Sequence, residues 1–215
     1  MCRLLFVQNR NEFNISEHLS KFATIAKNSK EYQGHGWGCS YLINNEWIHY
    51  RNISPIWEDD LNQFPTSKRL IVHARSAFED KDIVVENNMP FNDDKYVFIF
   101  NGELRGVKIK ADGRIGAEKI FNFIKRFDKS GMDKALPKGV KIINKKPSYI
   151  RAMNIIIAEK DRVHYSSLFN EDKEYFQMHF KQNDDELIIC SEVYPNETGW
   201  NKIENKLNGV FKWQL

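Results

Sequence analysis

Residues 1–7 read MCRLLFV, and the fold depends on this short apolar run. It predicts a buried strand that begins at the first residues of the chain, with Cys2 at its end. A small residue after methionine permits removal of Met1, which would leave a thiol and a free α-amine on one residue. An α-amine has an ordinary pKa of roughly 8, so it can take the thiol proton and return it to a leaving amine. A cysteine here is more often an incidental small apolar residue, so other motifs are needed to separate the two readings.

The remaining apolar runs predict an α+β protein with extensive antiparallel sheet. Asn14 resembles a helix cap before helical spacing over residues 16–28, and a second amphipathic helix begins at Ala117. Strands are predicted over residues 36–43, 46–51, 69–75, 96–100, 154–159, 163–169, 175–180, 187–191 and 209–214. The first two strands flank Asn44-Asn45, which favours a tight hairpin turn. No linker rich in Pro, Gly or Ser divides the chain, so we expect a single domain over residues 1–215.

Composition narrows the class of function. The formal charge is +3, from 32 basic and 29 acidic side chains, and this near balance gives no reason to expect a nucleic-acid partner. The densest basic run, residues 138–146, is interpreted as a solvated loop or strand edge.

No apolar run approaches the roughly 20 residues of a membrane span, and the N-terminus lacks the features of a signal peptide. Cys2, Cys39 and Cys190 form no CxxC pair and leave an odd thiol, which suits a reducing compartment. We expect a cytoplasmic protein with no membrane partner, cofactor or catalytic metal.

Several short motifs occur in one order along the chain. They are Met1-Cys2-Arg3-Leu4-Leu5, Gly34-His35-Gly36-Trp37-Gly38, His73-Ala74-Arg75-Ser76-Ala77, Glu86-Asn87-Asn88-Met89-Pro90-Phe91, Phe100-Asn101-Gly102-Glu103-Leu104 and Cys190-Ser191-Glu192. With these motifs in this order the sequence resembles the class II glutamine amidotransferases, above all compact members that lack a fused synthase domain. The resemblance implies an N-terminal-nucleophile hydrolase fold of four layers, αββα, with two stacked antiparallel sheets.

The resemblance also implies roles for single residues. Cys2 would be the nucleophile, while the Asn101 side chain and the Gly102 N–H would form an oxyanion hole with two donors. Arg75 would grip a substrate carboxylate with its planar fork, and His73 would orient the loop by hydrogen bonding. Two plainer readings stay open: Asn-Gly is commonly an ordinary turn, and a strand-end arginine can make a structural ion pair.

The sequence departs from the family where the substrate would bind. Glutamine-using members have an Asp that pairs with the substrate ammonium, and Gly116 stands at that position here. Glu118 or Glu79 would have to supply the missing carboxylate from a neighbouring position. Phe78 and Phe100 replace a Thr and a His that are usual in the family, which makes the pocket more apolar. These changes keep the machinery of acyl transfer and weaken the case for free L-glutamine as the substrate.

Three readings of function follow. The first is hydrolysis of a γ-glutamyl-type small-molecule amide through a Cys2 thioester, with water or a separate ammonia-accepting protein completing the cycle. The second is a degenerate member that binds a ligand or partner without turnover. The third is an N-terminal-cysteine acylase for a different amide, which would need an apolar acyl pocket. Retention of Cys2, Arg75, Asn101 and Gly102 favours catalysis, because a binding module has no need of a thiol facing two oxyanion donors.

Overall fold

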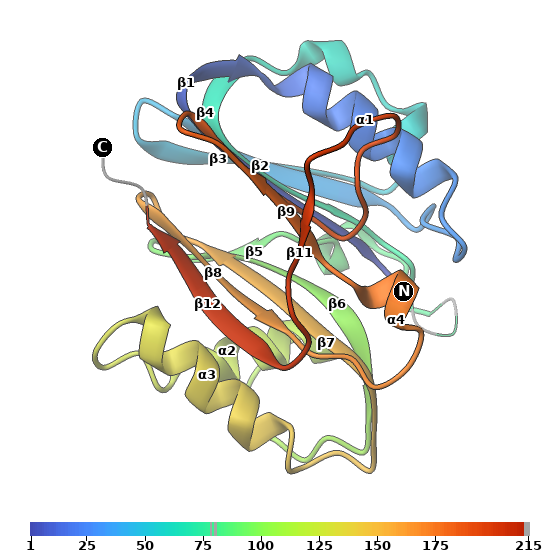
Figure 1. Ribbon diagram of the computed structural model, residues 1–215. Helices are drawn as coiled ribbons and strands as arrows, with labels where there is room; N and C mark the ends of the chain where they lie inside the picture. The colour runs from blue at the N-terminus through green and yellow to red at the C-terminus, as the bar shows by residue number, and fades with distance from the viewer. Residues whose placement is uncertain (78, 80, 213–215) are drawn as a thin grey trace.

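Two antiparallel sheets pack face to face in the computed structural model, which describes residues 1–77, 79 and 81–212 (Figure 1). The first sheet contains, in spatial order, β11 (Asn201–Lys202), β9 (His179–Gln182), β10 (Glu186–Cys190), β1 (Arg3–Asn14), β4 (Thr66–Ala74), β2 (Trp37–Ile43) and β3 (Glu46–Asn52). The second contains β12 (Leu207–Lys212), β8 (Arg162–Ser167), β7 (Tyr149–Ala158), β6 (Val97–Arg105) and β5 (Phe91–Asn92). We call them sheet A and sheet B.

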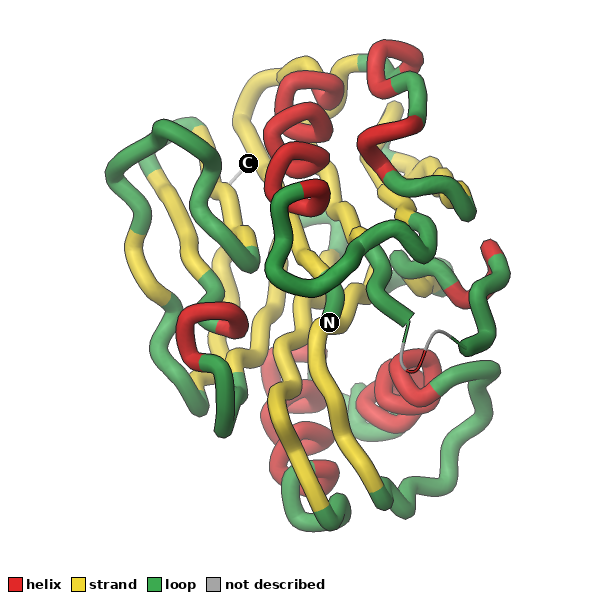
Figure 2. The backbone as a smooth tube through the Cα atoms, turned by 90° about the vertical axis from the view of Figure 1, so that its right-hand side faces the viewer, coloured by secondary structure: helices red, strands yellow, loops and turns green. Residues whose placement is uncertain are grey.

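Helices cover the outer face of each sheet. They are α1 (Ile15–Lys27) on sheet A, and α2 (Gly116–Lys125) and α3 (Met132–Ile143) on sheet B. The short α4 (Lys173–Phe176) lies beside the N-terminus, and further single turns occur at Ile56–Glu58, Leu61–Gln63 and Val85–Asn87. Figure 1 shows α1 outside sheet A and α2 with α3 outside sheet B, and Figure 2 shows the same order from the side. The predicted four-layer αββα fold is therefore confirmed. No helix in the described ranges is both long and apolar enough to cross a membrane.

Residues 3–8 of β1 are buried on both faces, because α1 covers one face of sheet A and sheet B covers the other. Leu5 and Val7 pack in the cluster that includes α1, whereas Leu4 and Phe6 pack in the cluster between the sheets. Burial on two faces explains the continuous apolar run, which lacks the alternation of a half-exposed strand. The strand extends to Asn14, beyond the predicted residue 7, and its pairing with β4 shifts register between Gln8 and Phe13.

Short sequence motifs correctly predicted the start of the first helix and the position of the hairpin. The Asn14 side chain accepts a hydrogen bond from the Ser16 backbone N–H at 3.0 Å, so it caps α1 as predicted. Asn44 and Asn45 have φ angles of 49° and 63°, the left-handed conformation of a tight hairpin turn. The predicted hairpin of β2 and β3 is confirmed, with Ile43 paired to Glu46.

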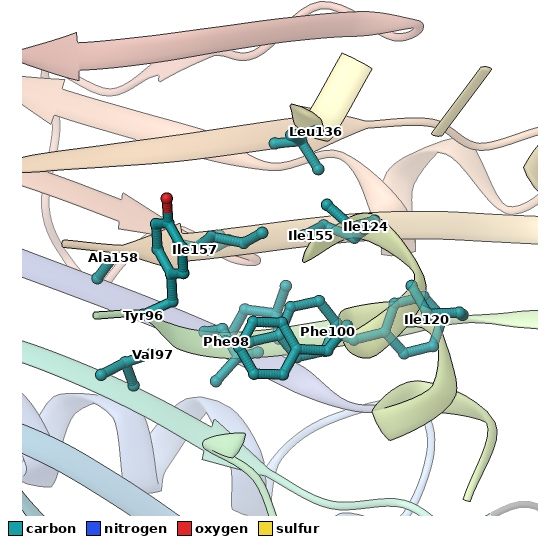
Figure 3. Close-up of a cluster of buried hydrophobic side chains, with 14 of the residues drawn as sticks. Tyr96, Val97, Phe98, Phe100, Ile120, Ile124, Leu136, Ile155, Ile157 and Ala158 are labelled. Carbon is teal, nitrogen blue, oxygen red and sulfur yellow. The ribbon is translucent and has the colours of Figure 1, made fainter. Parts of the chain in front are cut away.

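The largest core lies against sheet B and continues to sheet A. Phe98 of β6 stacks on Phe121 of α2 with ring centroids 4.8 Å apart, and Figure 3 shows Phe98 and Phe100 beside Ile120. Because side chains alternate along a strand, the next residue in line, Asn101, points to the opposite face, toward sheet A. This alternation decides which face of β6 enters the site described below.

Two predictions from the sequence are wrong. Residues 138–146 were expected to form a loop or strand edge, but most of them belong to α3. Pro137 and Gly139 weaken the helical signal, yet Gly139 lets α3 approach α2, because a Cβ there would lie 2.8 Å from Ile124 Cγ1. The strand expected over residues 175–180 is instead helix α4 followed by β9, since a short apolar run does not distinguish the two structures. Residues 213–214 of the last predicted strand lie outside the described residues.

Candidate active site

Cys2 lies at the end of β1, beside the end of β4. The pairs Arg3 with Ala74 and Leu4 with His73 place Cys2 next to Arg75 in the ladder. Cys2 shares a strand face with Leu4, which packs between the sheets, so the thiol is directed toward sheet B. The residue is 8% exposed, and Sγ lies 3.6 Å from the backbone oxygen of Ser76. The nucleophile predicted from the sequence therefore stands at the edge of the inter-sheet core.

Burial controls the acidity of this thiol. Desolvation raises the pKa of Cys2, and the N-terminal ammonium, the Ser76 backbone and Arg75 offset only part of the increase. The thiol is therefore neutral near pH 7. A neutral thiol needs a base to take its proton before it can attack a carbonyl.

Arg75 follows β4 and is almost fully buried. Its Nη1 donates to Asn88 Oδ1 at 3.3 Å, and its Nη2 donates to the backbone oxygen of Asp82 at 2.9 Å. Burial lowers the pKa of Arg75, while the nearby Cys2 and Asp82 act in the opposite direction. These two bonds fix the guanidinium plane, and its positive charge is close enough to the Cys2 thiol to lower the pKa of that thiol in part.

The glycine-rich segment before β2 holds the backbone of Arg75. The Arg75 N–H donates to the Gly36 oxygen at 2.9 Å, and the His35 N–H donates to the Arg75 oxygen at 3.1 Å. His35 Nδ1 accepts from the Ala77 N–H at 2.9 Å. Gly36 has a φ of +99°, and a Cβ there would lie 2.0 Å from Asn88 Nδ2, so only glycine fits. Gly36 therefore permits close backbone packing beside Arg75.

Asn101 and Gly102 lie on β6, on the other side of the inter-sheet space. Asn101 is fully buried, and within the described part of the chain neither its Oδ1 nor its Nδ2 has a hydrogen-bond partner. A Cβ on Gly102 would lie 2.2 Å from the Ala152 oxygen, so this position of β6 excludes any side chain. Buried amide groups are usually paired, so the Asn101 amide keeps both its donor and its acceptor capacity for a group outside the described side chains.

His73 ties the two halves of the site together. It is fully buried, and its Nε2 donates to the Phe100 oxygen at 3.2 Å, directly before Asn101. Burial, with the positive charge of Arg75, lowers the pKa of His73 to about 3, so the ring is neutral and carries its proton on Nε2. The bond joins β4 to β6 across the layer. The geometry suits the positioning role predicted for His73.

Gly116 and Glu118 make no described hydrogen bond or ion pair with Cys2, Arg75 or Asn101. A Cβ on Gly116, the first residue of α2, would meet no described atom within 4 Å. Glu118 accepts hydrogen bonds from Arg114 N, Nε and Nη2 at 2.6, 3.0 and 2.7 Å, and these bonds lower its pKa. Glu79 pairs with Lys81 at 2.6 Å, and Phe78 lies outside the described residues. No described contact brings the carboxylate of Glu118 or Glu79 to Cys2.

The C-terminal motif supports the nucleophile strand. The Leu4 N–H donates to Ser191 Oγ at 3.0 Å, and the Ser191 N–H donates to the Leu4 oxygen at 3.0 Å. Arg3 pairs with Glu192 at 2.6 Å, and its guanidinium carbon lies 4.2 Å from the centroid of the Tyr175 ring. Residues next to Cys2 are thus anchored on both sides.

The residues that surround Met1 were not predicted from the sequence. The Met1 ammonium forms an ion pair with Glu31, and the Met1 carbonyl oxygen accepts hydrogen bonds from Gln33 Nε2 and the Tyr175 hydroxyl. Burial raises the pKa of Tyr175 to about 12, so the phenol keeps its proton and remains a donor. Figure 1 shows the N-terminus beside α4, which carries Tyr175. No spacing in the sequence links these residues, because they meet only through tertiary packing.

Comparison with known proteins places this geometry in context. No family model matches the chain, and no curated protein matches it. Its structure matches a glutamine aminotransferase class-II domain protein from Silicibacter pomeroyi with a TM-score of 0.64 and 11% identity, over 100% of both chains. It matches a predicted glutamine amidotransferase from Pseudomonas aeruginosa with a TM-score of 0.63 and 13% identity, over 98% of this chain and 97% of the other.

Part of a larger enzyme has a similar fold. Glutamine phosphoribosylpyrophosphate amidotransferase from Bacillus subtilis matches with a TM-score of 0.61 and 13% identity, over 98% of this chain and 49% of that protein. At such low identity the likeness concerns the fold. The chain thus has the N-terminal-nucleophile fold of class II glutamine amidotransferase domains, in agreement with the order of its sequence motifs.

Proposed function

We propose that this protein is an amidohydrolase that cleaves a γ-glutamyl-type amide through a Cys2 thioester after removal of Met1. The observation that carries the proposal is the buried, unpartnered amide of Asn101. Asn101 directly follows Phe100, whose backbone oxygen is bound by His73 of β4, the strand that pairs with β1 beside Cys2. Arg75 supplies a fixed cation on the same side of sheet A. The match to class II glutamine amidotransferase domains adds independent support from the fold.

The reaction follows from these positions. Once Met1 is gone, the Cys2 α-amine takes the thiol proton and Sγ attacks the amide carbonyl. The Asn101 amide and the Gly102 N–H stabilise the negative charge on the carbonyl oxygen. The C–N bond breaks as the α-amine returns the proton to the leaving nitrogen. Water then attacks the thioester, releases the acid and restores the thiol.

Arg75 would hold a carboxylate at the acyl end of the substrate. A γ-glutamyl group carries such a carboxylate, and a fork held by Asn88 and Asp82 loses little freedom on binding it. Ammonia released from a primary amide would diffuse into solvent or pass to a separate acceptor protein.

We also propose a cytoplasmic location, because Cys2, Cys39 and Cys190 are all free thiols.

Intact-mass measurement with 6-diazo-5-oxo-L-norleucine tests the proposal. This glutamine analogue alkylates a nucleophile that recognises the glutamine side chain. The purified protein is expected to lack the mass of Met1 and to gain one adduct, because the buried thiol faces the space in which Arg75 fixes a carboxylate. Cys2→Ala, treated in parallel, should gain none.

The outcomes separate the readings of the sequence. A processed protein that forms no adduct would favour an amide outside the γ-glutamyl class. Retention of Met1 would contradict catalysis by Cys2, because no free α-amine would exist to serve as the base. A protein that gains its adduct but hydrolyses no amide would be a binding member.

Gly116→Asp tests whether the substrate reaches α2. Space for the side chain exists, and a carboxylate at a helix N-terminus is favourable. The variant is expected to improve kcat/KM for L-glutamine relative to glutaramate, which lacks the α-amine, by about 10-fold, equivalent to about 1.4 kcal/mol. Steady-state kinetics with both compounds gives this ratio. An unchanged ratio would mean that the substrate ammonium binds away from α2.

A further inference from the structure

Met1 fills a site with three distinct contacts. Its ammonium pairs with Glu31, and its carbonyl oxygen receives hydrogen bonds from Gln33 and Tyr175. Its side chain packs against a small apolar cluster made of Ala152, Phe169, Tyr175 and Phe176. A flexible terminus rarely makes contacts of all three kinds. The space around Met1 is therefore shaped for an ammonium, a hydrogen-bond acceptor and an apolar chain.

Loss of Met1 opens this space directly to the catalytic amine. The Cys2 nitrogen is bonded to the Met1 carbonyl carbon, so after cleavage the nitrogen is exposed where that carbon stood. In the proposed reaction the same nitrogen must give a proton to the departing amine, and proton transfer requires hydrogen-bond contact. The leaving group must consequently lie at the former position of Met1, whereas Arg75 holds the acyl end.

The charges in this space favour a cation. Glu31 is fixed by Arg151 Nη2 at 2.9 Å, and the same arginine also binds Asp172 and lies 3.8 Å from Glu103. Asp172 also pairs with Lys30 at 3.3 Å and Glu103 with Arg105 at 2.6 Å. After loss of Met1, Glu31 therefore keeps its bond to Arg151 and loses its contact with the ammonium. The Cys2 α-amine lies one residue, about 3.8 Å, further along the chain than the Met1 ammonium, so it does not take the place of that ammonium beside Glu31. The Glu31 oxygen that contacts the Met1 ammonium, Oε2, is then open to a second ammonium, whereas Oε1 stays bound to Arg151.

Resting on the proposed function, we infer that the space of Met1 becomes the leaving-group subsite and that it takes an aliphatic amine carrying a second, protonated amino group. The aliphatic chain lies along the apolar cluster, and the second ammonium pairs with Glu31. Hydrolysis then consumes one γ-glutamyl amide and one water, and it yields glutamate and a diamine. No redox partner is needed.

A pair of matched substrates tests the inference. The processed protein is assayed with γ-L-glutamyl-diaminobutane and with γ-L-glutamyl-pentylamide, in which a methyl group replaces the terminal ammonium. The expected kcat/KM is at least about 10-fold higher for the diamine derivative, because its terminal ammonium forms a partly desolvated ion pair with Glu31 that the pentyl group lacks. Glu31→Gln should bring the ratio of the two kcat/KM values to about 1. Glu174→Gln, on the exposed side of α4, should leave the ratio as in the wild type.

Failure of the inference and failure of the proposed function look different. Hydrolysis of both amides at equal kcat/KM would overturn the leaving-group subsite and leave the Cys2 mechanism intact. A wild-type preference that persists in Glu31→Gln would also overturn the assignment of the ammonium to Glu31. Hydrolysis of neither amide by a protein that lacks Met1 would overturn the proposed function and the inference together.

Discussion

Cys2→Ala is expected to lower kcat for amide hydrolysis by about 10⁴-fold or more, because it removes the atom that forms the thioester. The fold should survive. The side chain lies at a strand end, and its thiol makes one weak contact, at 3.6 Å, with the Ser76 oxygen. Alanine keeps the Cβ and the preceding backbone. The thermal unfolding midpoint of the variant should therefore stay close to that of the wild type, and a coupled assay of the released amine measures kcat.

Cys39→Ala is the matched control. Cys39 is also buried, but it belongs to the cluster packed around α1, on the face of sheet A away from the site. Removing its sulfur should cost about 1 kcal/mol of stability through a small cavity while turnover persists. If Cys2 is the nucleophile, Cys2→Ala should lose activity and keep its stability. Cys39→Ala should keep its activity and lose some stability. Turnover by Cys2→Ala would assign the chemistry to another residue.

Much of the fold could be predicted because its signals are local. The apolar run after Cys2 predicted an internal strand, Asn14 predicted the cap of α1, and Asn44-Asn45 predicted the hairpin. Helix α3 escaped prediction because Pro137 and Gly139 oppose helix formation locally. Packing against Ile124 overrides that tendency, and only the tertiary structure reveals such packing.

The residues of the candidate site also fall into two groups, those that belong to short sequence motifs and those that meet only in the tertiary structure. Cys2, Arg75 and Asn101 could be proposed from sequence because each belongs to a short motif, and the pairing of β1 with β4 then brings two of them together. Glu31 and Tyr175 could not, since they are separated by much of the chain and meet only around Met1. Their own neighbours in sequence form no motif. Residues that recognise the leaving group are therefore the part of the site that the sequence leaves open.

Asn101 offers the second large effect, because stability and activity should respond in opposite directions. Its side-chain amide is fully buried and, among the described residues, makes no hydrogen bond. An unsatisfied buried polar group costs about 1–3 kcal/mol. Asn101→Leu replaces the amide with an apolar group of similar shape, so the free energy of unfolding should rise by about that amount. Denaturant unfolding measures the change.

The same substitution should reduce kcat by about 10²–10³, the usual effect of losing one oxyanion-hole donor. Asn154, paired with Asn101 across the strands, is the control. It is equally buried, but its Nδ2 donates to the Phe176 oxygen at 2.7 Å and its Oδ1 accepts from the Leu168 N–H at 3.1 Å. Asn154→Leu leaves both partners unpaired and should therefore lower the free energy of unfolding by about 2 kcal/mol or more.

The signs of the two stability changes carry the argument. An amide kept for catalysis is tolerated at a cost to the folded state, so its removal stabilises the protein while it slows the reaction. An amide kept for structure behaves as Asn154 should. Destabilisation by Asn101→Leu comparable to that of Asn154→Leu would show that Asn101 has a structural partner in solution, and the oxyanion role would then lose its physical basis.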